Sequence, residues 1–182
     1  MMDPAIVRKC LGKLLSRQEP GLLVPKGPWS PELQREIRSL NPGKDADALA
    51  VQSGLLLWND DLDGSHAIAQ DLDDPHGAYL HGIMHRREPD YGNSKYWFRK
   101  VGGHPLFSQL RDAALDLLSD APARDPYRKA IEESKEWDPY RMIDWCQSAA
   151  EEREVAFLRA LQAIEIQGLT YYWLDRAKLP RP

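Results

Sequence analysis

The sequence predicts an all-α protein, an irregular multi-helix bundle of about nine helices that includes one duplicated helical hairpin. Apolar residues recur at helical spacing along most of the chain. Capping residues followed directly by proline mark the starts of segments, and no segment alternates apolar and polar residues as a strand would. Because 182 residues suit one domain, we expect residues 1–182 to form a single helical domain.

A capping residue followed by proline marks most of the expected helix starts, because proline at the first helical position has no amide hydrogen to leave unpaired. These pairs are Asp3-Pro4, Ser30-Pro31, Asp74-Pro75, His104-Pro105, Asp125-Pro126 and Asp138-Pro139. Asp45 is expected to cap the segment ADALAVQSGLLLWND, which is apolar nearly all round and therefore belongs in the core. The remaining helices are DLDGSHAIAQDL, which begins at Asp61, and YGNSKYWFRKV, which ends at Gly102. Residues 139–174 are predicted to form one long final helix.

One segment of the chain is weakly repeated. Asp61-Leu62 and Ser65 recur 29 residues later as Asp90-Tyr91 and Ser94. Each copy is predicted to be a helix, a turn and a helix, a pattern similar to the tetratricopeptide repeat. The usual period of that repeat is about 34 residues, and at least three copies are normally needed, so we expect one duplicated hairpin and not a repeat array.

Composition excludes some functions and favours a location. A net charge of −4 argues against general nucleic-acid binding. No run approaches the roughly 20 apolar residues that a membrane span needs, so no membrane association is expected. The two cysteines, Cys10 and Cys146, indicate free thiols, and with no apolar signal segment they favour the cytoplasm. Tyr171, Tyr172 and Trp173 are expected to be exposed and to offer a surface for a homodimer.

The sign of the charge changes abruptly near residue 86. Residues 45–85 contain eight aspartates and no lysine or arginine, whereas residues 86–100 carry five basic side chains. Two readings are open. Hairpins of opposite sign would attract each other across a packed interface. Alternatively, an acidic and a basic wall would form a cleft that holds a metal on one side and an anionic ligand on the other.

All five histidines lie between residues 66 and 104. His81 and His85 are four residues apart, which places both rings on one helix face and suits a shared divalent metal, with His66 or a nearby aspartate as third ligand. The zinc-protease motif is excluded, because glycine and isoleucine follow His81. A network of histidines bonded to carboxylates is the alternative. Residues 59–70 also resemble a calcium loop, but Gln70 replaces its final glutamate, so we expect a helix–helix turn capped by Asp63 there.

Residues 81–105, HGIMHRREPDYGNSKYWFRKVGGHP, form the most distinctive block of the sequence. The block resembles the signature H-x-I-x-H-R-R-E-x-D-x-x-N-x-K-Y-W-F-R-x-x-G-x-H-P of a family of small uncharacterised bacterial and fungal proteins. The resemblance implies a shared helical domain and no particular activity. The residues that it singles out are His81, His85, Arg86, Arg87, Glu88, Asp90, Asn93, Lys95, Tyr96, Trp97, Arg99 and His104.

Two functions therefore remain open from the sequence, and whether the protein is an enzyme is undecided. The first is a ligand-binding or interaction module with a polar groove for a small anionic ligand or an acidic peptide. The groove would be formed by His81, His85, Arg86, Arg87, Glu88, Asp90, Asn93, Lys95, Arg99 and His104. The second is a metal-dependent hydrolase that uses His81, His85 and either His66 or a carboxylate. The arginines have a structural alternative, since buried guanidinium groups need carboxylate partners.

Overall fold

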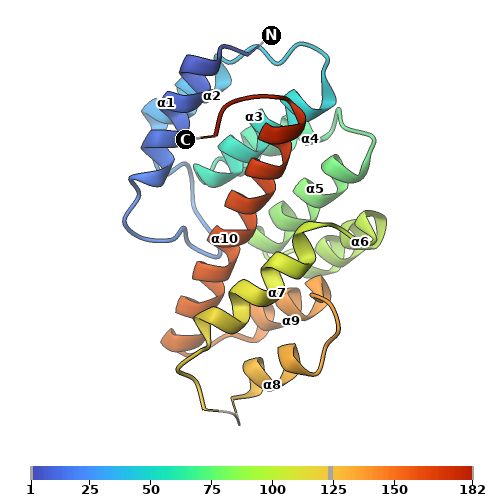
Figure 1. Cartoon of the computed structure of the whole chain (residues 1–182). Coiled ribbons are helices and arrows are strands. Elements are labelled where there is room, and N and C mark those ends of the chain that lie inside the picture. The colour runs from blue at the N-terminus through green and yellow to red at the C-terminus, as the bar shows by residue number, and fades with distance from the viewer. Residues whose placement is uncertain (1, 123–124, 182) are drawn as a thin grey trace.

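A computed structural model describes residues 2–122 and 125–181 and confirms the all-α prediction: these residues form ten helices and no strand (Figure 1). The helices are α1 (Pro4–Leu15), α2 (Pro31–Arg38), α3 (Ala46–Trp58), α4 (Leu62–Ala69), α5 (Pro75–Arg87), α6 (Tyr91–Val101), α7 (Leu106–Leu117), α8 (Pro126–Glu132), α9 (Pro139–Ser148) and α10 (Glu152–Arg176). None of these helices is long and apolar enough to cross a membrane.

The tenth helix arises because the last stretch of the chain is broken, contrary to the single helix that we expected. Ala149 has an extended backbone with ψ 122°, which ends α9. The Glu154 carboxylate then accepts hydrogen bonds from the amides of Ala150 and Glu151, and α10 restarts with a capping box. The signal was present in the sequence as a glutamate three residues after Glu151, but the apolar period on both sides obscured it.

The capping residues act as their spacing indicates. The aspartates and the serine that precede the helical prolines accept hydrogen bonds from amides of the first turn, as Asp45 does before α3. His104 differs, because Pro105 and not His104 occupies the N-cap of α7, although Nδ1 of His104 still accepts the amide of Leu106 at 3.1 Å. The segment that resembles a calcium loop is a capped turn, but the cap of α4 is Asp61, which also pairs with Arg38 at 2.9 Å, and not the expected Asp63, which lies in the first turn.

The repeated segment corresponds to two successive helical hairpins, α3–α4 and α5–α6. The first residues of α3 and α5, Ala46 and Pro75, are 29 residues apart, and so are those of α4 and α6, Leu62 and Tyr91. The helix starts therefore repeat with the same spacing as the repeated residues of the sequence. In both hairpins an aspartate, Asp61 or Asp90, caps the second helix. The hairpins pack against each other through α4 and α5, and this contact positions the site described below.

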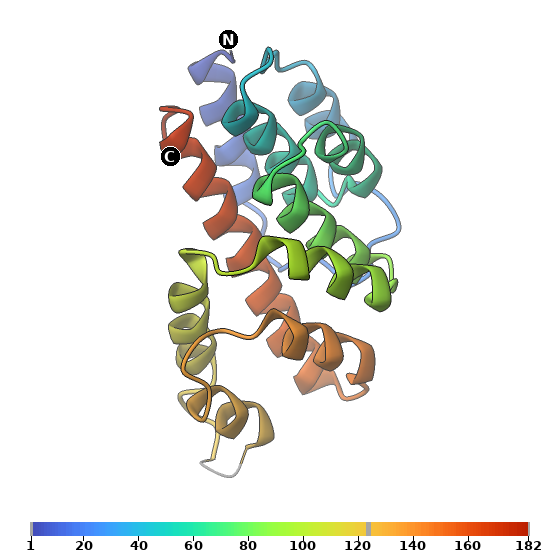
Figure 2. The same ribbon diagram turned by 90° about the vertical axis from the view of Figure 1, so that its right-hand side faces the viewer.

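Helix α10 spans much of the molecule and lies against α3 and α7 (Figures 1 and 2). Its buried side chains include Leu161, Leu169 and Trp173, which belong to the main hydrophobic core. Trp173 is 0% exposed, and Tyr171 and Tyr172 pack partly buried against the core. The expected exposure is therefore wrong for Trp173, whereas Tyr171 and Tyr172 are partly exposed, and a homodimer through this region stays a prediction.

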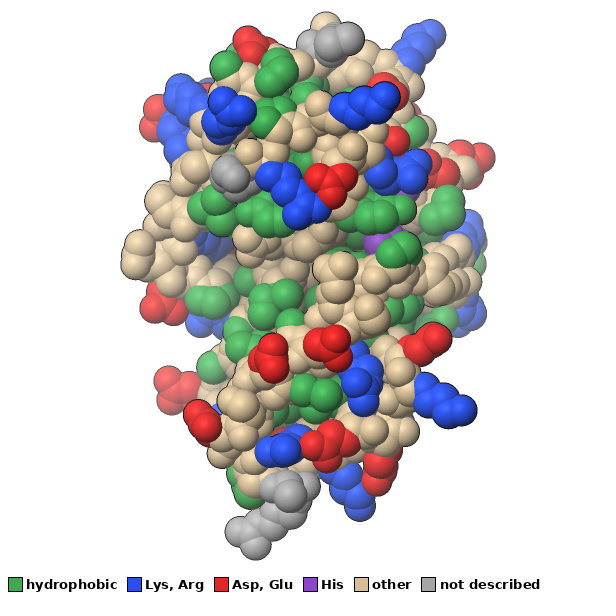
Figure 3. All heavy atoms as spheres, viewed as in Figure 1, with side chains coloured by type: hydrophobic (Ala, Val, Ile, Leu, Met, Phe, Trp, Pro, Cys, Tyr) green, Lys and Arg blue, Asp and Glu red, His purple; other side chains and the backbone are tan. Residues whose placement is uncertain are grey.

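The face of the molecule in Figure 3 has no single dominant charge. The face in Figure 3 mixes Lys and Arg with Asp and Glu side chains over all visible elements, and histidine reaches the surface only in a small area. Both cysteines are free thiols. Cys10 is buried in α1, and burial raises its pKa to about 11, so it is a protonated core side chain at neutral pH.

Candidate functional site

A cleft of about 590 Å³ opens between α4, α5 and α6. Helix α4 belongs to the first hairpin, whereas α5 and α6 form the second, so the cleft lies where the two copies meet. We name it the histidine cleft after the side chains that define it, which are His66, His81, His85, Asn93, Trp97 and Lys100. The cleft thus combines imidazole, amide, indole and ammonium groups.

Three imidazole rings meet in this cleft. The ring centres of His66 and His81 are 5.0 Å apart, and those of His66 and His85 are 5.8 Å apart. His81 and His85 are neighbours on α5, with ring centres 6.1 Å apart and planes 25° from parallel. The structure thus brings together the three histidines that the sequence suggested as a group, one from α4 and two from α5.

His81 has a defined hydrogen-bonding state. Its Nδ1 lies 2.7 Å from the carbonyl oxygen of Gly77, and because a carbonyl only accepts, Nδ1 carries the proton. Burial lowers the pKa of His81, so the ring is neutral at pH 7 and its Nε2 has a free lone pair. The ring stacks on Trp97 at a centroid distance of 4.1 Å and an angle of 15°, which fixes its plane.

His85 adopts the same tautomer. Its Nε2 lies 3.4 Å from the side-chain amide nitrogen of Asn93, which donates, so Nε2 accepts and Nδ1 carries the proton. Nδ1 is 3.2 Å from a carboxylate oxygen of Glu88, a close electrostatic contact without aligned hydrogen-bond geometry, and 4.0 Å from Asp90. Glu88 and Asp90 therefore stand behind His85 and stabilise it in this orientation.

Helix α6 supplies an aromatic and cationic wall. The ammonium nitrogen of Lys100 lies 4.5 Å from the ring centre of Trp97 and 4.9 Å from that of Tyr96. Such cation–π contacts hold the charge near the mouth of the cleft. Sequence reasoning did not place Lys100 in the site, although Asn93, Trp97 and Lys100 follow the i, i+4, i+7 spacing of one helix face. That spacing was the available signal.

Arg86 and Arg87 do not line the histidine cleft. The guanidinium of Arg86 bonds to Glu165 of α10 at 2.5 Å, and both side chains are fully buried. Tyr79 donates its hydroxyl to the same carboxylate at 3.2 Å. Residues 81–105 therefore do not form one continuous groove, because α5 points its successive side chains in different directions. The structural pairing proposed as the alternative is what these two arginines adopt.

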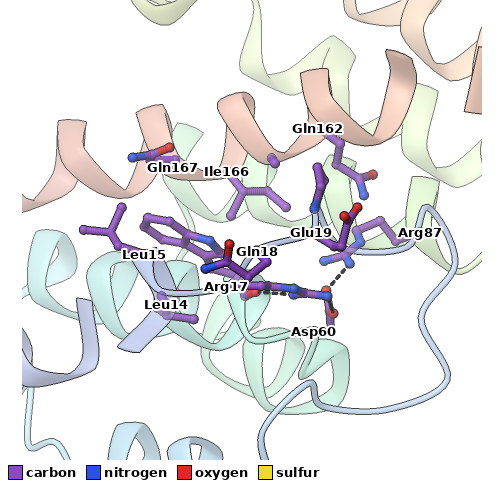
Figure 4. Close-up of a pocket in the computed structure, with 14 residues that line it drawn as sticks. Leu14, Leu15, Arg17, Gln18, Glu19, Asp60, Arg87, Gln162, Ile166 and Gln167 are labelled. Atoms are coloured by element: carbon purple, nitrogen blue, oxygen red, sulfur yellow. Dashed lines mark hydrogen bonds and ion pairs between the residues drawn. The ribbon is translucent and has the colours of Figure 1, made fainter. Parts of the chain in front are cut away.

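Arg87 contacts a separate, smaller cavity of about 180 Å³ (Figure 4). Arg87 pairs with one carboxylate oxygen of Asp60, and Arg17 pairs with the other oxygen at 2.7 Å. Arg87 also donates to the carbonyls of Leu57 and Leu22 at 2.9 and 3.1 Å. These bonds join the segment after α1 to the turn after α3, so this cluster has a structural role.

The other predicted site residues also lie apart from the cleft. Lys95 joins α6 to α9 through Asp144 at 2.5 Å, and the exposed Arg99 lies over the ring of Tyr96. His104 packs edge-on against Tyr79 and Tyr172, each at a ring distance of 4.9 Å. Of the predicted groove, His81, His85 and Asn93 line the cleft, and Glu88 and Asp90 support it from behind.

No family model, curated protein or solved structure matches the chain. The resemblance of residues 81–105 to a bacterial and fungal signature stays a prediction, as does the cytoplasmic location.

Proposed function

We propose that the protein is a ligand-binding module whose histidine cleft takes a small anionic ligand with a planar or apolar part. The observation that carries the proposal is the combination on α6 of the Lys100 ammonium and the Trp97 ring at one cleft of about 590 Å³. Small-molecule sites characteristically combine apolar walls with a few convergent polar groups.

The available hydrogen-bond donors suit an anion. The Lys100 ammonium has three donor hydrogens, and the Asn93 amide makes only a long 3.4 Å contact with His85 that a ligand can replace. Asp73 and Asp74 also line the cleft, on the segment that leads into α5, and one carboxylate oxygen of Asp74 accepts hydrogen bonds from the amides of His76 and Gly77 at 2.9 and 3.1 Å. The ligand would therefore meet mainly donors on the α6 side.

The test uses benzoate and inorganic phosphate as probes, titrated into the protein at pH 7 in the presence of a chelator. We expect benzoate to shift the NMR signals of Asn93 and the Trp97 indole, because it offers both a carboxylate and a ring. Lys100→Met should weaken this binding about tenfold, which corresponds to the loss of one charge-assisted hydrogen bond.

Lys95→Met is the matched control, because Lys95 lies on the same helix but pairs with Asp144 outside the cleft. It should leave benzoate binding unchanged. The proposal is wrong if neither probe shifts the cleft signals, or if the two lysine variants weaken binding equally.

A further inference from the structure

His81 has the hydrogen-bonding pattern of a metal ligand. A metal ion needs neutral imidazole with a free ring nitrogen, and the opposite N–H of such ligands is usually bound by a carbonyl or a carboxylate. His81 gives its Nδ1 proton to the Gly77 carbonyl, and His85 directs its own toward Glu88. His81 therefore keeps Nε2 free and has a hydrogen-bonded partner on the other side. Nε2 of His85 becomes available once its 3.4 Å contact with the Asn93 amide is replaced, and its Nδ1 has only the electrostatic contact with Glu88.

The ring separations are close to those of a three-histidine metal site. A ring nitrogen about 2.0 Å from zinc places the ring centre about 3 Å away, so tetrahedral ligation separates ring centres by about 5 Å. The observed values are 5.0, 5.8 and 6.1 Å. In residues 2–122 and 125–181 no group of three His, Cys, Asp or Glu side chains already has metal-binding geometry. Two of the three separations would have to shorten by about 1 Å.

His85 is common to both of these separations and can move, because its Nε2 has only a 3.4 Å contact with Asn93 and its Nδ1 has no hydrogen-bond partner. The other side chain that can adjust is His66. It is only partly buried and meets the other two rings edge-on, at 85° and 76°. A change in its side-chain torsions turns an edge-on ring so that a nitrogen faces the point between His81 and His85. His81 is held by Gly77 and Trp97 and forms the fixed part of the site.

We infer that His66, His81 and His85 bind one divalent first-row metal ion through Nε2, with zinc the best match to three imidazole ligands. Imidazole suits zinc, copper, iron and nickel, and three histidines leave a fourth position for water or another ligand. This inference rests on the cleft of the proposed function and deepens it, since a bound cation would add to the attraction of Lys100 for an anion.

The first measurement is metal content. Untagged protein is stripped with a chelator, incubated separately with Zn²⁺, Co²⁺ and Ni²⁺, desalted and subjected to elemental analysis. We expect about one equivalent of zinc to be retained, as one three-histidine site implies, and the Co²⁺ form to absorb in the visible range as tetrahedral cobalt does. Retention of none of the three metals would overturn the inference.

His66→Gln and His85→Gln locate the site. Each should weaken metal binding by more than about 100-fold. Loss of a residue that only hydrogen-bonds to a metal ligand typically costs about 10- to 100-fold. His76→Gln is the control, because His76 lies on the same helix α5 but contacts Asp47 at 3.1 Å outside the cleft. Circular dichroism verifies folding. An equal loss in His76→Gln, or full retention in His85→Gln, would contradict the assignment.

The two proposals in the cleft fail separately. The benzoate titration is made with chelator present, so it reports anion binding without metal. Metal binding without any effect of benzoate would leave the metal inference standing and remove the proposed function. Benzoate binding without retained metal would support the proposed function and remove the metal inference.

Discussion

At the scale of single residues, Arg86 and Glu165 form an ion pair that water does not reach. Burial disfavours the charge on Arg86, but Glu165, together with Cys146 and Tyr79, outweighs this effect, and the pKa of Arg86 is raised. The Nε and Nη1 groups of Arg86 have no hydrogen-bond partner among the described residues. A pair of this kind contributes little net stability, yet loss of one partner leaves a buried charge alone.

Arg86→Met should therefore lower the free energy of unfolding by about 3 to 5 kcal/mol, measured by urea denaturation. The double variant Arg86→Met with Glu165→Leu should recover most of this loss. Lys129→Met is the control, because its contact with Glu133 is exposed and 3.8 Å long, and should cost less than about 1 kcal/mol. Equal losses in Arg86→Met and Lys129→Met would contradict this account of the pair.

His104 should give stability a pH dependence. Burial, with a smaller effect of the charge on His76, lowers the pKa of His104 to about 4, whereas an unfolded histidine titrates near 6.5. The unfolded chain thus binds the proton first as the pH falls. The stabilisation is complete above about pH 6.5 and is lost progressively toward pH 4, by up to about 3 kcal/mol.

Thermal unfolding between pH 4.5 and 7.5 measures this effect. His104→Asn keeps an acceptor for the Leu106 amide but does not titrate, so its Tm should fall less steeply with acid than that of the wild type. Parallel curves for the two proteins would show that another group is responsible.

At the scale of helices, the contact between α5 and α6 requires a residue without a side chain at position 82. A Cβ atom built on Gly82 would lie 2.7 Å from two ring carbons of Phe98, which is itself buried. The close approach is supported by Ser94, whose hydroxyl donates to the Gly82 carbonyl at 2.6 Å. This packing sets where α6 presents Asn93 and Trp97 to the histidines.

Gly82→Ala should destabilise the protein by about 1 to 3 kcal/mol, because overpacking outweighs the better helix propensity of alanine. Gly12→Ala is the opposite case, since nothing lies within 4 Å of a Cβ atom there, and it should stabilise by up to about 1 kcal/mol. Chemical denaturation of both variants provides the comparison. A stabilised Gly82→Ala protein would mean that Phe98 moves aside at little cost.

The helices and part of the site could be predicted from local sequence, each from a different local pattern. Proline after a capping residue fixed most helix starts, and the i, i+4 spacing placed His81 beside His85. The partner of Arg86 could not be predicted, because Glu165 lies 79 residues away along the chain. The inward position of Trp173 likewise depends on how α10 packs across α3. Long-range packing directions are not encoded in local periodicity.

At the scale of the whole molecule, α10 holds distant segments together. Arg159 donates to the carbonyls of Pro20 and Gly21, at 2.5 and 3.1 Å, near one end of the chain. Glu165 pairs with Arg86 on α5, and Arg176 pairs with Asp47 on α3 at 2.7 Å. The two hairpins are thus fastened to a common helix, while the histidine cleft lies between them.

The position of that cleft has a mechanical consequence. His66 moves with the first hairpin, whereas His81 and His85 move with the second, so anything bound by all three becomes a cross-link between the repeated units. A relative displacement of the hairpins would pull the ligands apart, and an occupied cleft would resist it. Occupancy should therefore raise the melting temperature of the entire bundle and not only order a local loop. The two hairpins, by this arrangement, form a seam that neither possesses alone.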